Sequence, residues 1–330
     1  MTEITNTEQL KAYLGKLGNA KIDLNSLQLL AGGTANFVWR LLERSGKKII
    51  IKHAEPYLKT APGLSFSVDR MDFEHKAMTS VPPLLSPSSV VAVPEVYQYD
   101  SLSHVLMIED GGARTLKEAY ADPTLDTPTF GKALGRWLAG LHQRTKHTAI
   151  GDNQAAKSMY RFAYTHLAVA LQKYDQDPSL AEQIDAQYGS LLQTDDECVC
   201  HGDFWPGNVL IDDQGRLSIV DWEMVRRGCG ATDLGQFAAE AHLLDRFRGG
   251  KGLRTTFLEG YRGTGQLDNR FLKRVAIHMG VHLAFWPTRV SWGTETETKE
   301  IVKVGCELMK RALGQDESWL AGSLLNELQA

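Results

Sequence analysis

The chain has 330 residues, of which 43% are hydrophobic and 23% charged, with a formal net charge of −4. This composition is typical of a globular protein with a sizeable core, and it offers no basic surface for nucleic acid. No run approaches eighteen apolar residues and the first residues lack the pattern of a signal peptide, so we expect a cytoplasmic protein without a membrane partner.

The first hundred residues are predicted to be mostly strand. Residues 27–30 and 37–42 are β-rich runs, and between them stand Gly32, Gly33 and Asn36. Glycines in such a turn let backbone N–H groups approach phosphate closely. A plain hairpin turn would show the same residues, so this segment alone does not decide between the two.

The next two segments each contribute one charged residue. Lys52 ends the apolar strand 48–53, and Glu74 lies in the helical segment 69–78. A strand lysine paired with a helix glutamate orients the α- and β-phosphates of ATP in kinase-like folds. Taken singly, each residue would be read as exposed surface. Their order after the glycine turn favours a nucleotide site.

The predicted secondary structure changes from mostly strand to mostly helix after residues 104–112. Up to this point the sequence is rich in β-strands, and beyond it the pattern is mostly helical. The prediction is an N-lobe over 1–108, a hinge over 109–112 and a C-lobe over 113–330. The backbone of Ile108, Glu109 and Asp110 is expected to bind adenine, although an ordinary linker would look the same.

The C-lobe is predicted to be mainly helical. Apolar residues from Phe130 to Leu141 lie on one helical face, and a second helix is expected over 154–173. Cys198 and Cys200 are interpreted as buried strand residues rather than metal ligands. Short strands over 209–211 and 217–220 form a hairpin. Further helices are expected at about 233–247, 252–262, 268–286, 297–314 and 317–328.

The loop His201–Asn208 and the strand end at Asp221 carry the candidate chemistry. The hairpin between them places Asp203, Asn208 and Asp221 side by side. Two carboxylates and an amide at one point suit phosphoryl transfer, in which a protein orients the acceptor hydroxyl and holds a metal on the phosphates. We therefore expect Asp203 to accept or orient the hydroxyl proton, and Asn208 and Asp221 to bind metal.

These motifs resemble the aminoglycoside phosphotransferase and choline kinase family, relatives of the protein kinases. The likeness rests on His201, Asp203, Asn208 and the segment 220–223, and it spans about residues 25–245. The N-lobe is similar to the methylthioribose kinase branch. The resemblance implies a bilobal protein-kinase-like α+β fold, with a β-rich N-lobe and a mainly helical C-lobe. It also implies ATP and Mg²⁺ as cofactors. Gly202 replaces the arginine of protein kinases, which argues against that group.

The resemblance implies further roles around the loop. His201 is expected to support the loop through hydrogen bonds, and Asp233 to be structural. Glu223 is expected either to reach metal through water or to be structural. The family's acceptor site, for a small molecule with a hydroxyl group such as an aminoglycoside, sugar or amino alcohol, lies against the C-terminal helices. Its candidates here are Glu240, Asp245, His282, Trp286 and Trp292. A catalytically inactive nucleotide-binding pseudokinase is the alternative, and the sequence does not indicate an oligomeric state.

Overall fold

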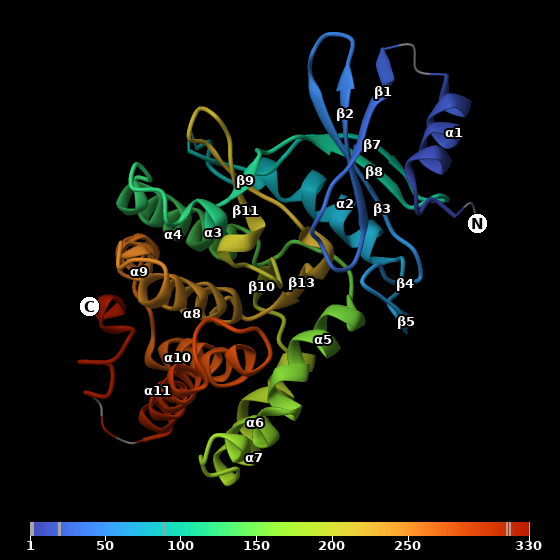
Figure 1. Ribbon diagram of the computed structural model, residues 1–330. Helices are drawn as coiled ribbons and strands as arrows, with labels where there is room; N and C mark the ends of the chain where they lie inside the picture. The colour runs from blue at the N-terminus through green and yellow to red at the C-terminus, as the bar shows by residue number, and fades with distance from the viewer. Residues whose placement is uncertain (1–2, 19–20, 89, 315, 317, 330) are drawn as a thin grey trace.

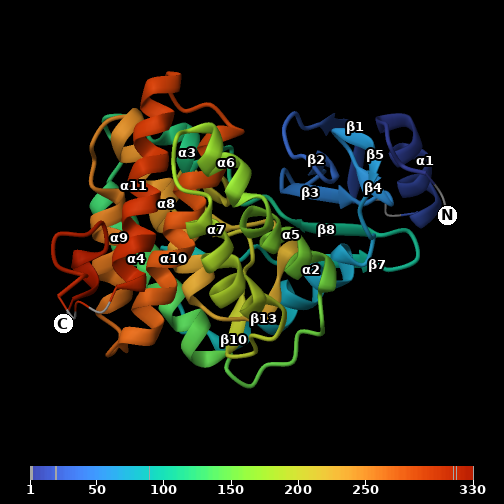
Figure 2. The same cartoon turned by 90° about the horizontal axis from the view of Figure 1, so that it is seen from below.

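The structure is a computed structural model that describes residues 3–18, 21–88, 90–314, 316 and 318–329. A β-rich N-terminal lobe stands beside a larger helical C-terminal lobe (Figures 1 and 2). This is the α+β arrangement that the sequence predicted. The strands are β1 (Ile22–Leu29), β2 (Phe37–Glu43), β3 (Lys48–His53), β4 (Tyr57–Leu58), β5 (Ala61–Ser65), β6 (Val91–Ala92), β7 (Val96–Asp100), β8 (Val105–Glu109), β9 (Arg114–Thr115), β10 (Cys198–Cys200), β11 (Val209–Ile211), β12 (Leu217–Ile219) and β13 (Arg226–Gly228). The helices are α1 (Thr7–Leu17), α2 (Arg70–Ser80), α3 (Leu116–Ala119), α4 (Thr127–Arg144), α5 (Gln154–Thr165), α6 (Leu167–Lys173), α7 (Ser179–Ile184), α8 (Ala231–Phe247), α9 (Leu253–Arg262), α10 (Asn269–Phe285) and α11 (Glu295–Leu313).

The N-lobe is built on an antiparallel sheet in the order β1-β2-β3-β8-β7. Side chains alternate between the two faces of a strand. Ile49 and Ile51 of β3 therefore join a core that includes Leu10 and Leu14 of α1. Ile50 joins the large core on the opposite side, and this alternation turns Lys52 toward the second lobe.

The two lobes are joined by a segment that passes very close to the C-lobe hairpin. A Cβ on Gly111 would lie 2.6 Å from the Cβ of Ser218, and one on Gly112 would lie 2.5 Å from the carbonyl oxygen of Ile211. Only glycine permits this approach. The hairpin belongs to a small sheet in the order β6-β12-β11-β9. Strand β6 therefore pairs within the C-lobe, although the predicted boundary assigned it to the N-lobe.

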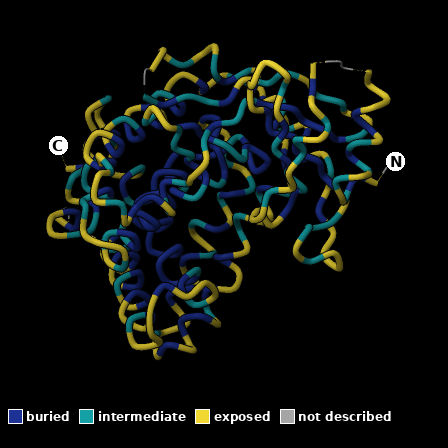
Figure 3. Tube along the Cα trace, turned by 45° about the horizontal axis from the view of Figure 1, so that its top comes forward, coloured by how far each residue is buried: buried dark blue, intermediate teal, exposed yellow. Residues whose placement is uncertain are grey.

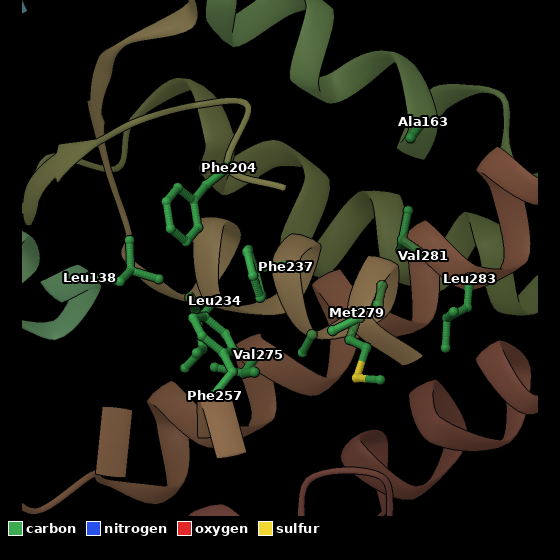
Figure 4. Packing of buried hydrophobic residues seen from close by; sticks show 14 of the residues in the cluster. Leu138, Ala163, Phe204, Leu234, Phe237, Phe257, Val275, Met279, Val281 and Leu283 are labelled. Carbon is green, nitrogen blue, oxygen red and sulfur yellow. The ribbon is translucent and has the colours of Figure 1, made fainter. Parts of the chain in front are cut away.

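The largest core fills the C-lobe, where buried chain is concentrated (Figure 3). Within it the ring of Phe204 lies 5.1 Å from that of Phe237 on α8, which lies 4.1 Å from that of Phe257 on α9 (Figure 4). Phe204 directly follows Asp203. These aromatic contacts therefore anchor the loop that carries the predicted catalytic group to the rigid helical core.

Two predicted helices differ from the structure. The segment 154–173 is not one helix, because it breaks at His166 into α5 and α6 and leaves Met159 and Phe162 41% and 42% exposed. The segment 317–328 forms turns and one 3₁₀ turn among its described residues, because Gly322 takes a φ of +69° and the hydroxyl of Ser323 bonds to the neighbouring backbone, donating to Leu320 and accepting from the N–H of Leu325. Helices α8 to α11 begin and end within two residues of their predicted bounds, whereas the short helices α3 and α7 were not predicted.

Among the described residues, no helix has the length and apolar character needed to cross a membrane.

Candidate active site

A cleft with a volume of about 350 Å³ lies between the lobes, a size typical of small-ligand pockets. Nine of the predicted nucleotide and metal residues and the supporting residue Glu223 line it; the nine are Gly32, Gly33, Asn36, Lys52, Ile108, Glu109, Asp110, Asn208 and Asp221. Gly32 and Gly33 have φ values of +92° and +71°, in the region that favours glycine. The turn between β1 and β2 thus requires its glycines for backbone conformation.

Lys52 joins the two lobes at the floor of this cleft. Its Nζ lies 2.7 Å from Oε1 of Glu74 and 2.7 Å from Oδ1 of Asp221. Burial would lower the pKa of Lys52, but Asp221 and Glu74 raise it above its usual value, so the ammonium stays charged. Glu74 also accepts the backbone N–H of Trp222 at 3.3 Å. The predicted lysine–glutamate pair is therefore present, with Glu74 behind the cleft rather than in its wall.

The carboxylate of Asp203 is held from two sides. Gln236 Nε2 donates to its Oδ1 at 2.7 Å, and Asn208 Nδ2 donates to its Oδ2 at 2.9 Å. Burial, and then the charge of Asp221, raise the pKa of Asp203 to about 6. A carboxylate with a raised pKa, fixed beside a ligand cleft, is suited to accept a proton.

The loop that carries Asp203 is fixed from beneath by a second carboxylate. Asp233, which is fully buried, accepts the backbone N–H of His201 at 2.7 Å and that of Gly202 at 3.0 Å. Burial lowers the pKa of His201, and its Nε2 lies 3.1 Å from the carbonyl oxygen of Val220. These contacts support structural roles for Asp233 and His201.

Gly202 takes a φ of +89°, and a Cβ there would lie 1.9 Å from the carbonyl oxygen of Met224. An arginine at this position, as in protein kinases, has no room. The departure from the kinase pattern is therefore a requirement of this loop's packing.

Glu223 and Asp221 follow the hairpin and face the glycine turn. Asp221 has a φ of +68°, unusual for a residue with a side chain and frequent at functional sites. Glu223 Oε2 accepts from Asn36 Nδ2 at 2.8 Å and lies 3.4 Å from Arg70 Nε. Burial and then Asp221 raise the pKa of Glu223 to about 8. Glu223 thus ties the glycine turn to the metal strand.

Two residues that sequence reasoning did not select take part in this arrangement. Arg70 is almost fully buried at the start of α2 and donates to Asn36 Oδ1 at 3.0 Å. Gln236 lies one helical turn beyond the start of α8. The only sequence signal for Arg70 is its place beside Glu74 on a predicted helix, and for Gln236 its place after Asp233.

The hinge residues lie where the lobes meet. Asp110 binds Arg40 of β2 through two hydrogen bonds, of 2.6 and 3.3 Å, and so fixes the hinge to the sheet. Replacing Arg40 with alanine should loosen this contact at the edge of the cleft. We expect the KM for ATP to rise about 5-fold, since a half-buried ion pair contributes about 1 kcal/mol. Steady-state kinetics would measure it, with the exposed Arg44→Ala as control, and an unchanged KM would contradict this role.

The acceptor candidates separate into two groups. Glu240 and His282 are both buried and bound to each other, with 2.7 Å between Oε1 and Nε2, and Trp286 lies beside His282. Asp245 instead caps α9, because its oxygens accept the backbone N–H groups of residues 252–254 and the hydroxyl of Tyr120. Its carboxylate is occupied, so we leave it out of the acceptor site.

The chain also brings His142 within reach of Cys198 and Cys200, which are buried strand residues as predicted. Both imidazole nitrogens of His142 are occupied, by Tyr261 at 2.9 Å and by Asp233 at 3.3 Å. No ring nitrogen is left for a metal ion.

The oxygen atoms near the cleft fit a magnesium ion. Asn208 uses its amide nitrogen on Asp203, which leaves its amide oxygen available. Asp221 uses Oδ1 on Lys52 and has a side chain that is 34% exposed toward the cleft. An amide oxygen beside a carboxylate oxygen is the ligand chemistry that Mg²⁺ prefers.

The model of the phosphotransferase enzyme family matches residues 26–270. The chain belongs to this family. It is similar to the 4-hydroxytryptamine kinase of Psilocybe cubensis, with 26% identity over 98% of each chain. In fold it is similar to the macrolide 2′-phosphotransferase MphH of Brachybacterium faecium, with a TM-score of 0.54 and 17% identity over 94% of this chain and 99% of that one. It is also similar to amicoumacin kinase hAmiN in complex with AMP-PNP and Ca²⁺, with a TM-score of 0.52 and 16% identity over 92% and 96%.

Membership of this family makes the chain an ATP-dependent phosphotransferase that acts on a hydroxyl of a small molecule, as the sequence predicted. The predicted resemblance to the aminoglycoside phosphotransferase family is confirmed, while the likeness of the N-lobe to the methylthioribose kinase branch stays a prediction. An inactive pseudokinase is the weaker alternative, since the predicted base, metal and phosphate residues are all present and brought together.

Proposed function

We propose that the chain transfers the γ-phosphate of ATP to the hydroxyl of a small aromatic amine, and that Asp203 is its general base. The observation that carries this proposal is the carboxylate of Asp203, fixed by Gln236 and Asn208 at the junction of the nucleotide cleft and the C-lobe helices. The aromatic amine is suggested by the curated relatives, two of which are named 4-hydroxytryptamine kinases.

The nucleotide half of the site orients the phosphates. Lys52, held by Glu74, donates to the α- and β-phosphates, and backbone N–H groups of the Gly32–Gly33 turn cover them. The backbone of Ile108, Glu109 and Asp110 binds adenine. The hydrogen bond from Asn36 to Glu223 ties the turn to the segment that follows Asp221.

The transfer half of the site holds the acceptor and the proton. Asp203 accepts a hydrogen bond from the acceptor hydroxyl and takes its proton as the oxygen attacks the γ-phosphorus. Asn208 and Asp221 would hold Mg²⁺, which offsets negative charge on the transferring phosphoryl group. Asp233 and His201 hold the loop in position. We place this activity in the cytoplasm, where ATP and Mg²⁺ are supplied.

The test is a phosphorylation assay of the wild-type protein with ATP, Mg²⁺ and 4-hydroxytryptamine. We expect ADP and a phosphorylated indole in equal amounts, measured by a coupled ADP assay and mass spectrometry. An aminopropanol, a macrolide and an aminoglycoside serve as comparison acceptors. Transfer to one of these but not to the indole would contradict the aromatic acceptor, and no transfer to any would contradict the wider proposal.

A further inference from the structure

Two oxygen atoms on one face of α8 lack hydrogen-bond donors. Gln236 and Glu240 are four residues apart, so their side chains lie one above the other, one helical turn along. Gln236 uses Nε2 on Asp203 but its Oε1 has no partner, and Glu240 uses Oε1 on His282 but its Oε2 has no partner. Both residues are more than 90% buried. A buried acceptor without a donor is unfavourable, and a donor from a bound ligand would remove this cost.

The unpartnered oxygens lie between the catalytic base and an aromatic wall. Ring contacts run from His282 to Trp286, with 6.3 Å between centroids, then to Phe285 at 5.2 Å and to Phe162 at 5.8 Å. Phe162 stands on α5 and is 42% exposed. Helix α5 packs against α10 and reaches the start of α8, where Tyr160 donates to the carbonyl oxygen of Thr232; these helices lie below the N-lobe in Figure 1. An acceptor with its hydroxyl at Asp203 would thus meet the amide oxygen of Gln236 and the carboxylate oxygen of Glu240 first, and the aromatic rings next.

Two tryptophan rings, one of them in the loop that carries Asp203, could bind a cation, but a lysine of the same chain already lies between them. The ammonium of Lys117 lies 4.7 Å from the ring centroid of Trp205 and 4.6 Å from that of Trp292. Two indole faces around a cation form the usual site for quaternary ammonium groups. Because Lys117 occupies this pair, the charge of an acceptor must be bound elsewhere.

We propose that Glu240 binds the protonated amine of the acceptor, with Gln236 Oε1 as the second hydrogen-bond acceptor and His282 holding the carboxylate in place. This rests on the proposed function and adds the specificity: the site selects an ammonium group that carries N–H donors. A quaternary ammonium has none, and an amine-free phenol leaves both oxygens unpaired.

The experiment compares Glu240→Gln with wild type on two acceptors that share ring and hydroxyl, 4-hydroxytryptamine and 4-hydroxyindole. Glutamine keeps the shape and a partner for His282, and Tm is measured to confirm folding. We expect kcat/KM for the amine to fall about 100-fold and that for the indole to change by less than about 3-fold, since loss of a buried charge partner has effects of this order. The control is Glu182→Gln, at an exposed position on α7, with no change on either acceptor.

Calorimetric binding of tryptamine, which has the ammonium but no hydroxyl, tests the site without catalysis. We expect binding to wild type and a Kd weakened about 100-fold in Glu240→Gln. No binding to wild type, or equal binding to both proteins, would overturn the amine site even if phosphorylation of the indole succeeds. Conversely, normal binding without phosphorylation would leave the amine site intact and contradict the proposed function.

The role of Lys117 is tested with the N,N,N-trimethyl derivative of 4-hydroxytryptamine. We expect wild type to use it at least about 10-fold less efficiently than the primary amine, because it offers no N–H to Glu240. Lys117→Met vacates the indole pair and should raise kcat/KM for the trimethyl acceptor relative to the primary amine. An unchanged ratio would overturn the self-filled cation site.

Discussion

Replacing Asp203 with asparagine should reduce kcat about 1,000-fold while leaving ATP binding intact. The side chain keeps its size, its amide oxygen can still accept from Asn208, and its NH₂ can donate to the unpartnered Oε1 of Gln236 once that amide turns, but it cannot accept the hydroxyl proton. General-base catalysis contributes about 10²- to 10⁴-fold, and phosphoryl transfer depends otherwise on positioning. Stopped-time assays of the phosphorylated product measure kcat, and fluorescence titration with a nucleotide analogue measures binding.

The matched control is Asp213→Asn, at an exposed position in the turn between β11 and β12, and it should keep wild-type kcat. A kcat within about 10-fold of wild type in Asp203→Asn would mean that another group takes the proton. A loss of nucleotide binding in parallel would mean that the substitution disturbs the cleft instead.

The same substitution should not destabilise the protein. Because burial raises the pKa of Asp203 to about 6, the folded protein binds this proton more tightly than the unfolded chain. The free energy of unfolding therefore falls as the pH rises from about 4 to about 6, and the full loss is present above pH 6; below about pH 4 both states are protonated and there is no effect. Asparagine does not ionise, so it removes this loss of stability. The Tm of the metal-free variant should therefore equal or exceed that of wild type at pH 8, and the two Tm values should converge near pH 4. A catalytic group held at a cost to stability is expected of an active site.

Much of this site could be predicted from local sequence because its groups stand at fixed offsets on regular elements. Lys52 faces the cleft by the alternation of β3, and Asp203, Asn208 and Asp221 meet because a short hairpin joins their segments. Arg70 and Gln236 could not be predicted in the same way. Their importance comes from contacts between lobes and between helices, which sequence spacing does not encode.

The two carboxylates of α8 also show that sequence spacing does not encode contacts between helices. Glu240 and Asp245 both carry carboxylates and are five residues apart, and both were expected at the acceptor site. Asp245 instead binds the first N–H groups of α9, since helix N-termini attract carboxylates. Glu240 meets His282 of a helix that begins almost thirty residues later. Which of two helical carboxylates is free for a ligand depends on what the tertiary fold brings to each.

Helix α1 was not predicted, although the sequence contains a signal for it. The first hundred residues were expected to be mostly strand, yet Asn6 and Gln9 form a capping box at the start of a helix whose Leu10 and Leu14 are buried against the sheet. The capping signature was present in the sequence. The prediction of a strand-rich lobe rested on the residues that follow this signature, and the signature itself was not used.

Replacing Asp233 with asparagine should damage stability and catalysis together. Its buried carboxylate accepts the N–H groups of His201 and Gly202 and lies 3.3 Å from Nε2 of His142. Burial would raise the pKa of Asp233, but the hydrogen bond from His142 and its charge hold it below the usual value. An amide would turn one NH₂ toward these donors and leave at least one buried N–H unpaired.

The expected loss for Asp233→Asn is about 3 kcal/mol of unfolding free energy, by analogy with other broken buried polar groups. At about 2 °C per kcal/mol for a chain of this size, Tm should fall by roughly 6 °C. Because the released loop carries Asp203, kcat should also fall even at temperatures where the variant is fully folded. Calorimetry and assays well below Tm separate the two effects. If Asp233→Asn lost stability alone, the loop would be held by Phe204 and its aromatic neighbours, and the carboxylate would serve only the fold.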